Sequence, residues 1–127
     1  MTKSKLEVEI FSYGEYEHWD QSDRSLPRLI KITDKIPARI GTEFGYVLRI
    51  RKGKGQKLSY RIEHPPFKDA DENVTPSFTG EYFISSNDYK FFLGDCIWEP
   101  LEDKLGKWVI TTYHEGKVIA QKSLTLL

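Results

Sequence analysis

The chain has 127 residues, of which 39% are apolar and 13% aromatic, and its 19 basic residues balance its 19 acidic ones. This length suits one domain, commonly ~100–150 residues, and such a chain buries roughly two-thirds of its unfolded surface, enough to fold without a disulfide or metal. The balanced charge excludes the overall positive field of a typical nucleic-acid-binding protein, and the single cysteine, Cys96, excludes an internal disulfide and a cysteine-rich zinc site.

Residues 1–127 are therefore expected to form a single domain, and no part of them resembles a targeting segment. The N-terminal residues MTKSKLEVEI lack the apolar stretch of a secretory signal. No window approaches the ~20 apolar residues of a membrane-spanning helix. We expect a soluble, cytoplasmic protein without membrane contact, a location that suits a single reduced cysteine.

Alternating apolar and polar residues predict strands in the first half of the chain. Leu6 to Ile10, Phe44 to Ile50 and Leu58 to Ile62 each show the period of two of a half-buried strand. Between the last two runs, the segment RKGKGQ offers two glycines for a turn, so we predict that these runs form a hairpin. The polar segment Trp19 to Leu29 is interrupted by Pro27 and is expected to be loop or irregular strand.

The second half begins with a predicted surface loop, Glu63 to Phe78, which contains His-Pro-Pro and Thr-Pro and few apolar residues. Strands are predicted over Tyr82 to Ile84 and Tyr89 to Leu93, with the turn-forming residues Ser-Ser-Asn-Asp between them. Trp98-Glu99-Pro100 then interrupts the chain.

The last 22 residues, GKWVITTYHEGKVIAQKSLTLL, predict a closing hairpin. Glu115-Gly116 supplies its turn, and Trp108 anchors its first strand in the core. On the return strand, Leu124 is out of phase with Ile119, so a β-bulge near Ala120 to Lys122 is expected to restore the register.

Six or seven short strands with turns every ~8–12 residues predict an all-β fold, an antiparallel β-sandwich of about seven strands. A small β-barrel is the alternative, because the pattern alone does not show whether a sheet closes on itself.

Several short motifs occur in a distinctive order. They are Tyr13-Gly14, the pattern T-x-x-I-P-A-x-x-G-x-x-F-G from Thr33 to Gly45, His64-Pro65-Pro66, and G-x-W-x-I-x-x-Y-x-x-G-K-x-I-A from Gly106 to Ala120. This order resembles that of a bacterial family of uncharacterised single-domain proteins, a domain of unknown function with an immunoglobulin-like sandwich. The resemblance spans almost the whole chain, and it implies the fold without assigning any catalytic or binding residue.

Aromatic residues crowd one stretch of the chain, and five of them are the candidate binding site. They are Tyr82, Phe83, Tyr89, Phe91 and Phe92. Because neighbouring residues of a strand point to opposite faces, one member of each adjacent pair faces away from the core. We expect this outward aromatic surface to be covered by the segment Glu63 to Phe78, to be covered by a second copy of the chain, or to form a contact site.

Other patterns have structural explanations. The basic segment Arg49 to Lys57 could bind phosphates, but we expect a solvated tip whose lysines oppose aggregation. Asp69-Ala70-Asp71-Glu72-Asn73 begins like a calcium loop yet lacks the glycine and the final glutamate that such a loop needs. Gly41 and Gly45 are expected to form a tight turn or bulge at the entrance of a strand.

No catalytic or metal-binding pattern stands out. His18, His64 and His114 lack the spacing of metal ligands. Acidic and bulky apolar neighbours should raise the pKa of Cys96, which is expected to be a buried structural thiol. We therefore expect no enzyme, metal or cofactor.

These observations predict a non-catalytic protein-interaction or binding module, with itself, as a homodimer, or another protein as the partner. A small-ligand, carbohydrate-like binding sandwich is the alternative, because outward aromatic rings near Asp and Asn suit stacking on a sugar. Nucleic-acid binding is not expected.

Overall fold

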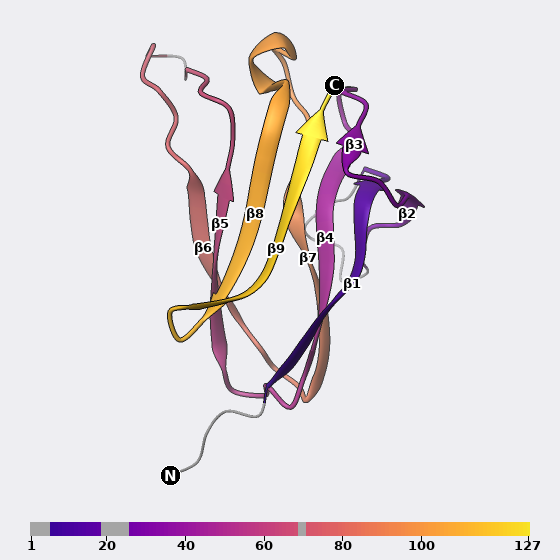
Figure 1. Ribbon diagram of the computed structural model, residues 1–127, viewed down its shortest axis with the longest axis vertical. Coiled ribbons are helices and arrows are strands. Elements are labelled where there is room, and N and C mark those ends of the chain that lie inside the picture. Colours follow the sequence, from indigo (N-terminus) through magenta and orange to yellow (C-terminus); the bar gives the residue numbers. More distant parts are fainter. Residues whose placement is uncertain (1–5, 19–25, 69–70) are drawn as a thin grey trace.

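The structure is a computed structural model that describes residues 6–18, 26–68 and 71–127 (Figure 1). Most of the predicted loop Trp19 to Leu29, and Asp69-Ala70 of the acidic segment, lie outside the described residues. The elements are β1 (Glu7–Tyr16), β2 (Leu29–Lys31), β3 (Lys35–Ile36), β4 (Glu43–Arg51), β5 (Lys57–Glu63), β6 (Phe78–Phe83), β7 (Asp88–Cys96), the 3₁₀ turn η1 (Glu102–Lys104), β8 (Gly106–His114) and β9 (Lys117–Leu126). No helix among these described elements is long and apolar enough to cross a membrane.

The strands form two sheets that pack face to face. One sheet has the order β2-β1-β4-β7 and the other the order β3-β9-β8-β5-β6. Among the described strands, all ladders are antiparallel except the short parallel pair β3 and β9. The predicted sandwich is confirmed, and the barrel alternative is wrong because β6 and β7 remain at the edges of separate sheets.

The predicted hairpin of residues 44–50 and 58–62 is wrong. Both runs are strands, but β4 lies in the four-stranded sheet and β5 in the five-stranded sheet, so the segment between them crosses from one sheet to the other. Their apolar faces meet across the core, where Leu48, Ile50 and Leu58 are buried in one cluster. Alternation identifies a strand with one buried face, but it does not identify the neighbour that pairs with that strand.

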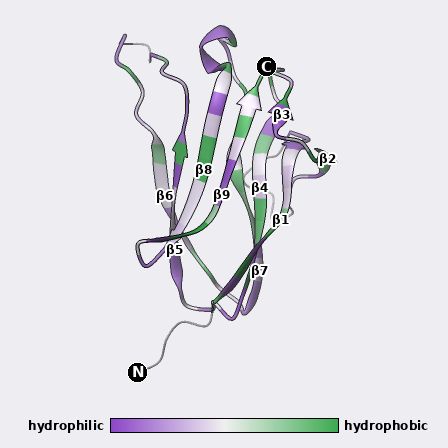
Figure 2. Ribbon diagram, in the orientation of Figure 1, coloured by the Kyte–Doolittle hydropathy of each residue, from purple (hydrophilic) through white to green (hydrophobic). Residues whose placement is uncertain are grey.

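The closing hairpin is confirmed. Glu115 and Gly116 have φ angles of 51° and 79°, the two positive values of a tight hairpin turn. Thr112 pairs with Ala120 but Tyr113 pairs with Val118, so the residue between them is the bulge, one position before the predicted range. In Figure 2, β8 carries a hydrophilic (purple) band near its start and a hydrophobic (green) band in its middle.

Trp108 is the centre of the core, as predicted. Its side chain is completely buried, and its ring meets that of Phe44 edge to face at 5.0 Å. The indole Nε1 donates a hydrogen bond of 2.8 Å to the carbonyl oxygen of Lys104, so η1 satisfies the polar atom of the largest core side chain.

A row of glycines crosses the four-stranded sheet. Gly14, Gly45 and Gly94 pair with one another across β1, β4 and β7. Gly45 has a φ of +152°, and a Cβ there would lie 2.2 Å from the carbonyl oxygen of Leu93. The prediction of a turn is confirmed at Gly41, whereas Gly45 lies inside β4 in a continuous register, so the turn or bulge predicted there is wrong.

Candidate functional site

The five predicted aromatic residues do not form one outward surface. Tyr82, Tyr89 and Phe91 point between the sheets and pack in or against the main core. Phe92 points outward but is 4% exposed, because Tyr16 and Leu29 cover it. Only Phe83 is exposed, at 61%.

The prediction of a contiguous aromatic face is therefore wrong, and so is the prediction that the segment Glu63 to Phe78 covers it. The outward ring of Phe92 is covered by the chain itself, through the end of β1 and β2. The physical reason is the topology: β6 and β7 belong to facing sheets, so their inward rings meet in the core, as Tyr82 and Phe91 do at 4.5 Å.

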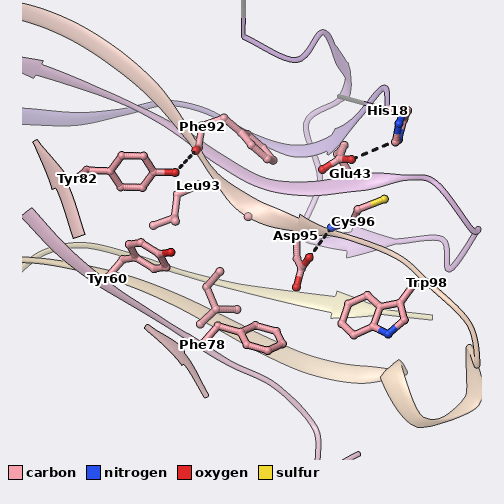
Figure 3. A pocket seen from close by; sticks show the side chains of 12 residues that line it. His18, Glu43, Tyr60, Phe78, Tyr82, Phe92, Leu93, Asp95, Cys96 and Trp98 are labelled. Carbon is pink, nitrogen blue, oxygen red and sulfur yellow. Dashed lines mark hydrogen bonds and ion pairs between the residues drawn. The ribbon is translucent and has the colours of Figure 1, made fainter. Parts of the chain in front are cut away.

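The same topology produces a pocket where the edge strands β6 and β7 face each other. Its volume is about 530 Å³. Two sets of residues line it, one on each side of β7 (Figure 3). The inner set, between the sheets, includes Tyr60, Ile62, Phe78, Tyr82, Asp95 and Trp98. The outer set includes His18, Glu43, Phe92 and Cys96.

The inner side combines aromatic rings with one carboxylate. The rings of Tyr60 and Tyr82 lie 5.5 Å apart, and the Tyr82 hydroxyl donates a 3.3 Å hydrogen bond to the carbonyl oxygen of Phe92. Asp95 points into the same space as Phe78 and Trp98 (Figure 3). Half-buried rings around a single polar group are typical of small-ligand sites.

Burial raises the pKa of Asp95 to about 6, with a further contribution from the nearby charge of Glu43. The backbone N–H of Cys96 donates a 2.8 Å hydrogen bond to Oδ1 of Asp95 and opposes this rise only in part. At neutral pH the carboxylate is mostly ionised, and its burial in this charged form lowers the free energy of unfolding. A perturbed carboxyl group in a pocket indicates a functional site.

The charge of the pocket restricts its ligands. Its ionisable lining residues among those described are Glu43, Asp95, His18, Cys96 and the two tyrosines, with no lysine or arginine. Negative charge at the pocket repels phosphates and carboxylates. The pocket is therefore suited to a neutral or positively charged ligand.

The outer side brings three candidate metal ligands together. Glu43 pairs directly with Cys96 across β4 and β7, and His18 Nδ1 lies 3.6 Å from Oε2 of Glu43. One ligand atom from each of the three residues lies within 4.8 Å of the others. Burial and the Glu43 carboxylate raise the pKa of Cys96 to about 11, the direction that the sequence predicted, although the thiol is only half-buried.

The three histidines do not converge. His64 packs against the rings of Phe67 and Phe78, at 4.3 and 4.9 Å. His114, at the end of β8, contacts Oε1 of Gln56 through Nε2 at 3.0 Å. Only His18 lines the pocket.

The basic segment from Arg49 to Lys57 is largely compensated by acids. Arg49 makes two hydrogen bonds, of 2.9 and 2.8 Å, to Asp88. Lys52 pairs with Glu7 at 3.3 Å and Lys57 with Glu81 at 3.8 Å. These pairs reduce the positive charge available to a phosphate, and the segment joins two sheets, so the hairpin tip predicted there is wrong.

Sequence reasoning missed most of the pocket. Tyr60, Phe78, Trp98, Glu43 and Asp95 were not candidates, and of the five predicted residues only Tyr82 and Phe92 line it. The available signal was the inward phase of Asp95: it alternates with Phe91 and Leu93, which places a carboxylate on the core face of β7.

A family model described as a domain of unknown function (DUF3859) matches residues 4–126. The structure is similar to that of an immunoglobulin-like protein from Pseudomonas aeruginosa, with 21% sequence identity and a TM-score of 0.77, covering 95% of this chain and 97% of that one. No protein with a curated description matches the chain. The similarity confirms the immunoglobulin-like sandwich predicted from the motifs.

Proposed function

The chain belongs to the domain-of-unknown-function family DUF3859, and from that premise we propose that it is a non-catalytic binding module for a small, sugar-like ligand. The ligand occupies the inner side of the pocket between β6 and β7. The observation that carries this proposal is the position of Asp95, an ionisable carboxylate set among Tyr60, Phe78 and Trp98.

The two kinds of side chain recognise different parts of a sugar ring. Aromatic faces stack on its C–H groups, and a carboxylate accepts hydrogen bonds from its hydroxyls. A hydroxyl that donates to Asp95 also replaces the water that this half-buried carboxylate has lost. A phosphorylated sugar is disfavoured by the acidic lining.

The arrangement gives little support to catalysis. A glycosidase needs two carboxyl groups that flank one bond. Asp95 and Glu43 both line the pocket but lie on opposite sides of β7, so they do not face each other across one bond (Figure 3). The Cys96 thiol, with a pKa of about 11, stays protonated at neutral pH and is a poor nucleophile. These features support a binding role. The cytoplasm remains the proposed location of the protein.

Saturation-transfer NMR with a panel of monosaccharides tests the proposal. We expect at least one pyranose to bind, and sorbitol, which has hydroxyls but no ring, not to bind. Asp95→Ala should weaken binding about tenfold or more, since a hydrogen bond to a charged group contributes ~1.5–3 kcal/mol.

The matched control is Asp34→Ala, because Asp34 is exposed next to β3, at the opposite edge of the same sheet from β6. This variant should bind like the wild type. Absence of binding across the panel, or equal weakening by both substitutions, would refute a sugar site at Asp95.

A protein partner, or a second copy of the chain, is the second candidate, and Phe83 favours it. This ring is 61% exposed at the end of β6, whose outer edge has no neighbouring strand in the described chain. Exposed edges and aromatic anchors are common features of interfaces. In sedimentation velocity at tens of micromolar, we expect a wild-type dimer that Phe83→Ser converts to a monomer. A monomeric wild type would exclude the homodimer.

A further inference from the structure

The cluster on the outer side of β7 has the chemistry of a metal site, and we propose that His18, Glu43 and Cys96 bind one Zn²⁺ ion. The three side chains supply a nitrogen, an oxygen and a sulfur atom, all within 4.8 Å of one another. This inference does not rest on the proposed sugar site, which lies on the other side of β7.

The fold fixes two of the three ligands firmly. Glu43 is the first residue of β4 and Cys96 the last residue of β7, and they face each other in the ladder. Beyond this pair the two chains stay joined, because the N–H of Ile97 donates to Thr42 O at 2.9 Å and the N–H of Gly41 donates to Ile97 O at 3.0 Å. Cross-strand partners have Cβ atoms ~4.5–5.5 Å apart, so both side chains can reach one ion.

The third ligand comes from the neighbouring strand. Tyr16, the last residue of β1, pairs with Glu43, and His18 follows two positions later. The N–H of Glu17 donates to Arg28 O at 2.9 Å, which holds the backbone just before the histidine. One end of each of three strands of the same sheet therefore lies at this point: β1 ends here, β4 begins here and β7 ends here. A residue that zinc accepts as a ligand lies at or just beyond each of these strand ends.

The set of donor atoms selects the ion. Cysteine sulfur, histidine nitrogen and a glutamate oxygen are all zinc ligands, whereas Ca²⁺ and Mg²⁺ prefer oxygen alone. In a tetrahedral zinc site, ligand atoms lie about 3.5 Å apart, given bond lengths of ~2.0–2.3 Å. The His18 Nδ1 to Glu43 Oε2 distance of 3.6 Å already fits, and the His18 side chain is 72% exposed, which leaves it room to turn toward Cys96.

Binding exchanges a proton for the metal. The Cys96 thiol gives its proton to the buffer, its sulfur bonds to Zn²⁺, and a water molecule takes the fourth position. The charges of the thiolate and the Glu43 carboxylate balance the two positive charges of the ion. Three protein ligands with an open fourth position characterise zinc sites that bind a further ligand.

Titration of the tag-free protein with Co²⁺ tests the site, because thiolate-bound cobalt absorbs by charge transfer and tetrahedral cobalt has intense visible bands. We expect saturation at one Co²⁺ per chain and full displacement by one equivalent of Zn²⁺. Cys96→Ser should abolish the charge-transfer band. His18→Gln should weaken Zn²⁺ binding at least tenfold in calorimetry, and since His18 is exposed this variant is expected to fold.

His114→Gln is the matched control, because His114 is not one of the three clustered ligands and does not line the pocket. It lies at the end of β8 and contacts Gln56. It should bind both ions like the wild type. The site is refuted if the wild type binds neither ion, if the stoichiometry differs from one, if His18→Gln and Cys96→Ser bind as tightly as the wild type, or if His114→Gln weakens binding as much as His18→Gln.

Discussion

Gly45→Ala is expected to lower the free energy of unfolding by at least about 3 kcal/mol, a large part of the ~5–15 kcal/mol that stabilises a typical domain. Two causes add. A φ of +152° is strained for any residue with a side chain, and the new Cβ would lie 2.2 Å from Leu93 O and 2.6 Å from the Cα of Gly94. Because both contacts are backbone atoms in the middle of a ladder, β7 would have to move away. Urea unfolding followed by circular dichroism measures the loss.

Gly55→Ala separates the two causes. Gly55 also has a positive φ, of +86°, but nothing lies within 4 Å of its added Cβ. This variant should lose only about 1 kcal/mol, the cost of the backbone conformation. Equal losses of unfolding free energy in the two variants would mean that the close approach of β4 and β7 adds nothing to the cost of a side chain at Gly45.

Asp95→Asn is expected to raise the free energy of unfolding by about 2 kcal/mol at pH 7.5, measured with a chelator present. Burial raises the pKa of Asp95 from 3.8 to about 6 in the folded chain, so the folded state holds the carboxyl proton more tightly than the unfolded state does. Asparagine keeps the shape and an oxygen that accepts the Cys96 N–H, and it removes the charge that folding must desolvate.

The pH dependence follows from the sign of this shift. The raised pKa contributes stability that is fully present below pH ~4 and is lost as the pH rises through about 6. Wild type and Asp95→Asn should therefore have equal stabilities near pH 3.5 and diverge up to pH ~7, with the variant the more stable. A stability difference that is constant across this range would show that Asp95 is not desolvated.

A carboxylate that destabilises its own fold is informative about function. Natural proteins keep such residues where activity needs them, so a stabilising substitution in a binding site commonly weakens binding. For Asp95 we infer that stability and ligand binding oppose each other.

The sequence predicted the strands well because alternation is a local property. The runs at 44–50 and 58–62 became β4 and β5, and Trp108 became the core anchor. It did not predict which strands pair, since a strand with one buried face can find its partner beside it or across the core. That is why residues 52–56 became a crossover between the sheets.

The site escaped prediction for the same reason. Glu43 and Cys96 are neighbours only through the register of β4 on β7, and nothing in their local spacing indicates it. Phe92 follows the expected outward phase, yet its cover depends on how β2 packs against β1. By contrast, the direction of the Cys96 pKa shift was predicted from its neighbours along the chain, although burial and the cross-strand Glu43 cause most of the rise and Asp95 contributes less.

Mapping the sugar titration on the ¹H–¹⁵N spectrum tests the proposed pocket most directly. A bound pyranose should shift the backbone amide of Asp95 and the indole N–H of Trp98 saturably, with the same dissociation constant, and leave Phe83 and Asp34 unchanged. These shifts should disappear in Asp95→Ala. Saturable shifts confined to residues outside the pocket, or no saturable shift for any sugar, would contradict a binding site between β6 and β7.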